Sequence, residues 1–289
     1  MQIKNYFSLI KFSHTIFALP FAIVGFFLAV KAEGEALDWT LLLLVLLCMV
    51  FARSAAMAYN RYLDRDIDKR NPRTVVREIP AGIISPRSAL VFVVINSLLF
   101  VLTTYFINSI CFFLSPIALL IILGYSYTKR FTFLCHFILG LGLSLAPIGA
   151  YLAVVGEFHL LPILYALAVL FWVSGFDIIY ALQDEAFDRS LNLKSIPVQL
   201  GGKNALLLSN ILHLLCAFCM IGASVLMDQL YTSAAWLHWL ATIIFLGLLF
   251  YQHRLVRPND LSKVNLAFFT TNGVASVIFG MLIVLELYV

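Results

Sequence analysis

The stretch AYNRYLDRDIDKRNPRT, residues 58–74, directly follows the apolar run LLLLVLLCMVFARSAAM, residues 41–57. This run supplies most of a helix long enough to cross a membrane, which takes about 20 apolar residues. The stretch that follows carries three aspartates among arginines and lysines. Ionisable side chains at membrane depth are costly, so a cluster of them indicates a functional site where the chain leaves the bilayer.

The composition extends the membrane interpretation to the whole chain. Of its 289 residues, 62% are hydrophobic and 12% are charged, and the mean hydropathy is +0.98. Soluble domains are about 45–50% apolar and about 25% charged. The excess of apolar side chains cannot be buried in one water-soluble core. The sequence therefore predicts an all-α polytopic membrane protein.

Apolar runs of span length predict nine transmembrane helices, and the breaks between them fall at glycine, proline, asparagine and charged residues. The first run is interpreted as a retained helix rather than a signal peptide, because no small-residue cleavage site follows it. The predicted spans are about 13–31, 39–60, 88–107, 110–128, 133–155, 160–182, 204–226, 233–251 and 265–287.

Lysine and arginine predict the orientation. If the N-terminus is cytoplasmic, all 19 lie in cytoplasmic connections except Lys31, which lies outside, and Arg53, which lies within a span. The positive-inside rule therefore places the C-terminus outside, in a membrane expected to be the prokaryotic inner membrane. Two cytoplasmic connections, about 61–87 and 183–203, are long. We expect residues 1–289 to form one transmembrane domain capped by these two loops.

Two acidic motifs lie where the second and sixth predicted spans reach the cytoplasmic side. Four residues turn an α-helix by about 400°, so side chains at this spacing share one face. Carboxylates stacked on one face repel each other unless cations lie between them. The motifs are Asn60-x-x-x-Asp64-x-x-x-Asp68 and Asp177-x-x-Tyr180-x-x-x-Asp184-x-x-x-Asp188.

The motifs predict a magnesium–diphosphate site on the cytoplasmic side. Oxygen-only ligands favour Mg²⁺, which usually binds one or two carboxylates together with substrate phosphates. The expected metal ligands are Asp64, Asp68, Asp184 and Asp188. Basic residues near them, Arg73, Lys129 and Lys194 among others, suit the phosphates. The alternative is that the aspartates only balance the basic loops, which explains one motif more easily than two on the same side.

Three more residues are candidates for binding a second ligand, here called the acceptor, at such a site. Arg53 lies seven residues before Asn60, on the same helix face and about 10 Å deeper. It could bind the carboxylate of an aromatic acid, or instead snorkel to the interface or bond to the backbone. Asp177, two turns before Asp184, is a candidate orienting group or base. His14 is a weaker acceptor-binding candidate, for which packing is an equal alternative.

The segments NRYLDRDID (60–68) and DIIYALQDEAFD (177–188) resemble the two signatures, NxxxDxxxD and DxxxD, of the UbiA superfamily of intramembrane prenyltransferases. The resemblance spans nearly the whole chain, since KFSHTIFALPFA, NPRTVVREIPAG, YSYTKR and NLKSIPVQLGG fall in the family's order. It is strongest to the 4-hydroxybenzoate polyprenyltransferase branch, including members assigned to the futalosine route to menaquinone. Ser126 replaces the family's usual proline, and Phe187 precedes Asp188 where paired aspartates are usual.

The resemblance implies nine helices around a central cavity that opens laterally to lipid. It also implies an allylic polyprenyl diphosphate donor and Mg²⁺. Asn60 would bind the metal–diphosphate with the four aspartates, and Tyr125 and Lys129 match the family's YxxxK.

The expected function is transfer of a polyprenyl group to the ring of an aromatic acid, like 4-hydroxybenzoate, in ubiquinone or menaquinone biosynthesis. Besides these two substrates, membrane lipid is the expected partner, and no nucleic acid is. Two alternatives stay open. One is a different acceptor, such as a naphthoate, haem or a sugar phosphate. The other is a lipid or phosphate transporter.

Overall fold

The computed structural model describes residues 3–34, 36–231 and 236–288, and the backbone alone for residues 3 and 12–14. The described residues are nearly all helical. Their only β-type pairing is an isolated bridge between Arg257 and Asp260. Two compact units share the chain. The first comprises the N-terminal segment to Thr15 and Asp38–Thr128, and the second comprises Ile16–Leu37 and the chain from Lys129 onward.

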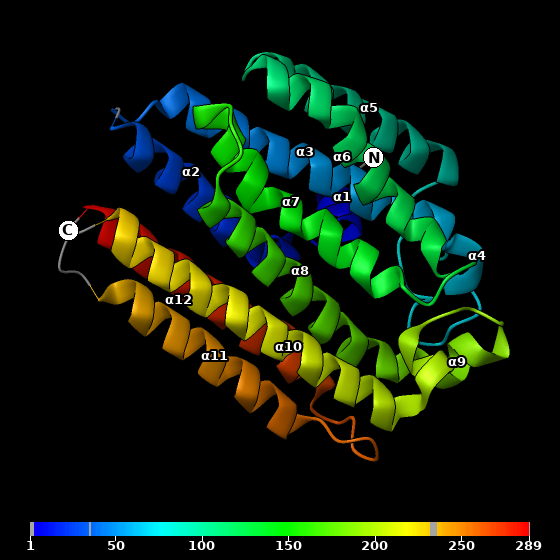
Figure 1. Cartoon of the computed structure of the whole chain (residues 1–289). Helices are drawn as coiled ribbons and strands as arrows, with labels where there is room; N and C mark the ends of the chain where they lie inside the picture. Colours follow the sequence, from blue (N-terminus) through cyan, green and yellow to red (C-terminus); the bar gives the residue numbers. More distant parts are fainter. Residues whose placement is uncertain (1–2, 35, 232–235, 289) are drawn as a thin grey trace. The chain divides into compact units, whose positions relative to one another are not determined.

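The first unit is built around α3, which packs against α5 and α6 (Figure 1). Asp38 caps α3, since its Oδ1 accepts a hydrogen bond from the Thr40 N–H at 2.7 Å. Large apolar side chains such as Leu98 and Leu120 are exposed on the outer helices, as expected for surfaces that face lipid. The helices are α1 (Ile3–Leu9), α3 (Trp39–Leu63), α4 (Arg65–Asp68), α5 (Pro86–Tyr105) and α6 (Ser109–Thr128).

The second unit is built around α8, which packs against α7 and α10 (Figure 1). The helix α2 packs against α7 and α12, and α11 packs against α12. The 3-10 turn η1 (Phe12–Phe17) leads into this unit. Its elements are α2 (Leu19–Glu33), α7 (Cys135–Val155), α8 (Leu160–Ala181), the 3-10 turn η2 (Leu182–Asp184), α9 (Glu185–Ser190), α10 (Ile196–Leu230), α11 (Leu237–Leu255), the π-helical η3 (Leu266–Thr271) and α12 (Asn272–Tyr288).

Aromatic side chains fill the centre of the second unit. Trp172 on α8 lies 5.5 Å from Phe21 and 5.2 Å from Phe245, measured between ring centroids, and its Nε1 donates a hydrogen bond to Asn272 Oδ1 at 2.9 Å.

Glycine allows close contact between the helices α2 and α7. A Cβ on Gly25 of α2 would overlap the carbonyl of Pro147 on α7.

A helix lies at each predicted span, and eight helices in the described part of the chain are long and apolar enough to cross a membrane. The exception is α11, whose last turns carry Gln252, His253 and Arg254. Two predicted spans begin later as regular α-helix, because η1 precedes α2 and η3 precedes α12. Gly201, with a φ of 76° and a ψ of 158°, interrupts α10 close to the predicted start of its span.

Candidate active site

The first acidic motif lies at the end of α3 in the first unit. The Asp64 N–H donates to the Asn60 carbonyl at 2.9 Å, and the Asp68 N–H donates to the Asp64 carbonyl at 2.7 Å. This helical bonding pattern continues across the junction between α3 and α4, so the predicted shared face is consistent with the backbone. Asn60 Nδ2 also donates to Asp64 Oδ2 at 3.2 Å. Asp64 and Asp68 are each only 4% exposed, whereas the side chain of the intervening Asp66 is 77% exposed.

A buried cluster of charged residues surrounds the first motif. Arg77 Nη1 lies 2.7 Å and 2.9 Å from the two carboxylate oxygens of Asp68. Arg61 is buried, and it lies within electrostatic range of Arg77, Asp68 and Tyr125. The Nε of Arg61 has no hydrogen-bond partner among the described residues. An unpartnered buried guanidinium nitrogen is costly unless a ligand satisfies it. The cluster is therefore chemically suited to an anion.

The loop after α4 is held against this cluster. Thr74 Oγ1 donates to the Asp68 carbonyl at 3.1 Å, and Ser8 Oγ donates to Glu78 Oε1 at 2.5 Å. The Arg73 N–H donates to Asn71 Oδ1 at 2.9 Å, so the buried Asn71 fixes the backbone at the predicted diphosphate-binding Arg73. The loop is thus an ordered part of the site and not a simple connection.

The second acidic motif lies in the second unit, where α8 ends. Asp184 closes the 3-10 turn η2, and Asp188 is in α9 and 8% exposed. The predicted continuous α-helical face from Asp177 to Asp188 is therefore interrupted, because a 3-10 turn advances each residue by about 120° instead of about 100°. The Asp188 carbonyl accepts the N–H groups of Leu191 at 3.2 Å and Leu193 at 2.9 Å, which turns the chain toward Lys194.

Two of the predicted diphosphate-binding lysines are joined through their backbones in the second unit. The Lys194 N–H donates to the Lys129 carbonyl at 2.8 Å. Lys129 follows α6 and Lys194 precedes α10, so this bond connects two segments that are distant in sequence. With Asp188 at the start of the same turn, the second unit brings acidic and basic candidates together.

Asp177 forms a contact that the sequence analysis did not predict. His136 Nδ1 lies 2.7 Å from Asp177 Oδ2, and the Ile196 N–H donates to His136 Nε2 at 3.3 Å. The histidine side chain is 4% exposed and that of Asp177 is 23% exposed. The signal available in the sequence was an ionisable side chain within a predicted span, at the end predicted to be cytoplasmic.

The predicted acceptor residues differ in how far the structure describes them. Arg53 Nη2 donates to the Lys11 carbonyl at 3.2 Å, and its buried Nε has no partner among the described residues. Tyr125 lies within electrostatic range of Arg53 and Arg61. The backbone of His14 lies in η1, but its side chain lies outside the described part of the structure.

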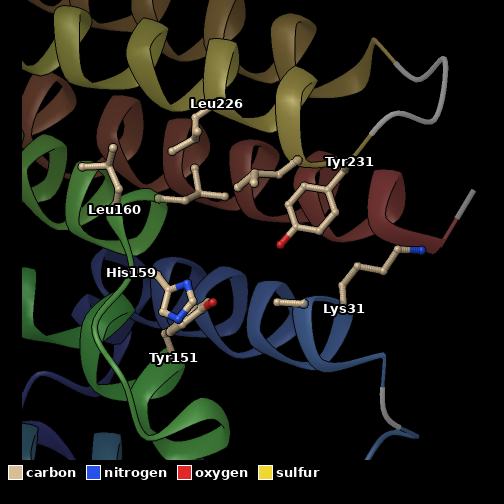
Figure 2. Close-up of a pocket in the computed structure, with 9 residues that line it drawn as sticks. Lys31, Tyr151, His159, Leu160, Leu226 and Tyr231 are labelled. Atoms are coloured by element: carbon tan, nitrogen blue, oxygen red, sulfur yellow. The ribbon is translucent and has the colours of Figure 1, made fainter.

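A cavity of about 710 Å³ opens in the second unit at the opposite end of α8 from Asp184 (Figure 2). Figure 2 shows Tyr151, His159, Tyr231 and Lys31 around it, with leucines on another side. Burial raises the pKa of Tyr231 to about 12, and its hydroxyl donates to the Leu28 carbonyl at 3.3 Å. The 22 residues of α8 span about 33 Å. This cavity therefore does not belong to the acidic motif of the same unit.

Comparison with known proteins identifies the class of molecule. The profile of the UbiA prenyltransferase family matches residues 18–274, which includes parts of both units. The 4-hydroxybenzoate octaprenyltransferase of Aliivibrio fischeri strain MJ11 is 31% identical over 250 residues, covering 84% of this chain and 82% of the relative. The enzyme of the same name from Nitrosomonas eutropha is 32% identical over 243 residues, covering 84% and 83%.

Solved structures of UbiA homologs resemble this chain as well. The apo structure of a UbiA homolog from Aeropyrum pernix K1 has a TM-score of 0.82 at 32% identity and covers 94% of this chain and 98% of its own. A UbiA homolog from Archaeoglobus fulgidus, bound to GPP and Mg²⁺, has a TM-score of 0.71 at 22% identity and covers 99% and 100%, which supports the fold.

These findings place the chain among the integral membrane enzymes built from apolar helices with two acidic motifs. It belongs to the UbiA prenyltransferase family.

The aspartates fit the divalent metal that the motifs imply. In the described residues, no three histidine, cysteine or acidic side chains are grouped so that they could hold a metal ion. Each unit instead supplies two of the four proposed metal ligands, and Mg²⁺ usually takes one or two carboxylates and completes its shell with phosphate and water. Asp64, Asp68 and Asp188 are buried carboxylates, and Asp68 is paired with Arg77. Oxygen-only, mostly buried donors of this kind are suited to Mg²⁺.

Proposed function

We propose that this prenyltransferase transfers a polyprenyl group from polyprenyl diphosphate to the ring of an aromatic acid resembling 4-hydroxybenzoate, and that it requires Mg²⁺. The burial of Asp64, Asp68 and Asp188 in two family motifs, each accompanied by basic residues, carries the proposal. The names of the relatives from Aliivibrio fischeri and Nitrosomonas eutropha support the acceptor. The aspartates Asp64, Asp68, Asp184 and Asp188 are the proposed metal ligands.

Five residues of the chain are assigned to the diphosphate of the prenyl donor. Asn60, Arg73, Tyr125, Lys129 and Lys194 bind the diphosphate, and their positive or hydrogen-bonding groups favour its departure from the allylic carbon. Bound Mg²⁺ would supply further neutralisation of the leaving group. A site embedded in the membrane suits this chemistry, because the donor tail is a lipid and water would capture the allylic cation.

Three residues are assigned to the aromatic acceptor: Arg53, Asp177 and His14. Arg53 binds the carboxylate of the aromatic acid, and its Nε, which has no partner in the described part of the chain, supports this role. Asp177 orients the acceptor or removes the ring proton after the new carbon–carbon bond has formed. The Arg53 bond to the Lys11 carbonyl supports a structural contribution as well.

The cellular setting is part of the proposal. The distribution of lysine and arginine supports a cytoplasmic N-terminus and an active site on the cytoplasmic side of a prokaryotic inner membrane. An aromatic acid with a polyprenyl chain on its ring is a precursor of a lipid-soluble quinone. We therefore assign the reaction to ubiquinone or menaquinone biosynthesis.

One assay tests the proposal. Membranes containing the protein are incubated with labelled geranyl diphosphate, Mg²⁺ and one acceptor at a time: 4-hydroxybenzoate, a hydroxynaphthoate, or none. Labelled lipid product should form with 4-hydroxybenzoate and disappear with EDTA, and membranes carrying Asp184→Asn provide the matched control. Product with the naphthoate alone would replace the acceptor assignment. Loss of transfer with every acceptor would refute the function.

A further inference from the structure

We propose that His136 is a positioning residue that holds the Asp177 carboxylate in one orientation for the acceptor. This inference rests on the proposed function. His136 is on α7 and Asp177 is on α8, 41 residues apart, and the two side chains meet at 2.7 Å. Asp177 is not among the four proposed metal ligands, and His136 belongs to neither acidic motif.

The local packing of α7 against α8 brings the pair together. A Cβ on Gly140 would overlap the Leu170 carbonyl and Ser174 Oγ, so only glycine allows the two helices this close. His136 lies one turn before Gly140 on α7. Ser174 Oγ also lies 3.2 Å from the His136 carbonyl, which fixes the backbone at the histidine. The close packing of α7 against α8 therefore places the imidazole beside Asp177.

The hydrogen bonds determine which imidazole nitrogen carries the proton. Ile196 is the first residue of α10, and its N–H has no acceptor within that helix. It donates to His136 Nε2, so this nitrogen supplies a lone pair. The proton of the neutral ring is then on Nδ1, where it is donated to Asp177 Oδ2. Protonation of Nε2 would set two N–H groups against each other, so His136 orients the carboxylate and does not take up its proton.

The second oxygen of the Asp177 carboxylate, Oδ1, is not held by the histidine. The Asp177 side chain keeps 23% of its surface exposed, and within the described residues Oδ1 accepts no hydrogen bond. A buried histidine that fixes one oxygen and leaves the second available is the arrangement expected for a carboxylate that acts on a ligand. Two roles are open to Oδ1, namely accepting a hydrogen bond from the acceptor and accepting its ring proton.

A purely structural role makes a different prediction. Through Ile196, His136 also fixes the start of α10, two residues after Lys194. Loss of that contact would disturb a predicted diphosphate ligand and raise the KM for the prenyl diphosphate. Loss of the Asp177 contact should instead lower kcat. The two contacts use different ring nitrogens, so two isosteric substitutions separate them.

The experiment compares His136→Asn with His136→Gln in the full-length protein. The asparagine amide occupies the place of Nδ1 and can still donate to Asp177, whereas the glutamine amide oxygen occupies the place of Nε2 and can still accept from Ile196. We expect His136→Gln to lower kcat about 10- to 100-fold with an unchanged KM for the diphosphate. We expect His136→Asn, which loses the Ile196 contact, to keep kcat within about threefold of wild type and to raise the KM for the diphosphate. An active glutamine variant, or equal losses in both, would overturn the inference.

Two further readouts keep the result decisive. If wild type transfers no prenyl group, the proposed function fails, whereas an active wild type with the wrong order of variants refutes only the role of His136. If neither variant accumulates, ¹⁵N-histidine NMR of the wild type, with Asp177→Asn to assign the signal, should show a neutral ring protonated at Nδ1. An Nε2-protonated or doubly protonated ring would contradict the proposal.

Discussion

Arg77 lies against both carboxylate oxygens of Asp68, at 2.7 Å and 2.9 Å, nine residues after it in the chain. A predicted metal ligand is thus paired with a guanidinium group in the structure. Because Asp68 is buried, removing the arginine would take away the guanidinium group that contacts both oxygens of this buried carboxylate.

Replacing Arg77 should therefore destabilise the protein. We expect Arg77→Ala to cost about 3 kcal/mol and to lower the apparent melting temperature of the detergent-solubilised protein by several degrees. The double variant Asp68→Asn with Arg77→Ala should recover part of this loss, because no uncompensated carboxylate is then buried. Equal melting temperatures for the two variants would show that the ion pair contributes little.

The motif aspartates should be required for transfer but not for folding. Asp64→Asn and Asp184→Asn keep the shape of the side chain and remove the charge that binds Mg²⁺, so transfer should fall below detection. Asp66→Asn is the matched control, because Asp66 lies in the same stretch but is mostly exposed. Its activity should stay near that of wild type. Wild-type turnover by either motif variant at saturating Mg²⁺ would refute the metal–diphosphate assignment.

Arg53 should act on the acceptor and not on the donor. Loss of a charge-assisted bond predicts that Arg53→Ala lowers kcat/KM for the aromatic acid about 10- to 100-fold, with little change in the KM for the prenyl diphosphate. Arg53→Lys should recover only part, since an ammonium group cannot replace the planar fork.

The control for Arg53 is a phenol without the carboxylate, which wild type and Arg53→Ala should use equally poorly. The bond to the Lys11 carbonyl makes a structural effect measurable too. A lower melting temperature with an unchanged acceptor KM would mean that this backbone contact is the whole role of Arg53.

The proposed orientation can be tested with single cysteines. In a background lacking the five native cysteines, Arg70→Cys and Ser190→Cys introduce thiols at exposed positions of the two acidic-motif loops. An impermeant thiol reagent should label neither in intact cells. Ala36→Cys, in a predicted outside connection, should react and serves as the positive control. The opposite pattern would invert the topology.

Two glycines offer a matched test of the second unit. Gly25→Ala would place a methyl group against the Pro147 carbonyl and should cost about 1–3 kcal/mol, because backbone cannot move aside easily. Gly149→Ala, on the same helix as Pro147, meets no atom within 4 Å and should change stability by about 1 kcal/mol or less. Melting temperatures of the two variants in detergent give the comparison.

The spans and the two acidic motifs were predictable because hydropathy and helical spacing are local properties of a sequence. The backbone bonds between Asn60 and Asp64 and between Asp64 and Asp68 illustrate this, because they follow the helical spacing of the motif. The His136–Asp177 contact was not predictable in the same way, since it depends on how α7 packs against α8 at Gly140.

Local backbone geometry explains why two other features of the site could not be predicted from the sequence. The 3-10 turn η2 broke the assumed helical phase before Asp184. The sequence marked Arg77 as one basic residue among several, and only the fold of the loop selects it as the partner of Asp68.

The bond between the Lys194 N–H and the Lys129 carbonyl uses no side-chain atom of either lysine. Mutation at one position can therefore change the charge or length of a side chain without displacing the backbone of the other. During evolution, such a main-chain anchor lets a lineage adapt its basic residues to a new leaving group one substitution at a time. For the protein engineer, the same feature marks Lys129 and Lys194 as positions where a library can vary side chains on a fixed frame.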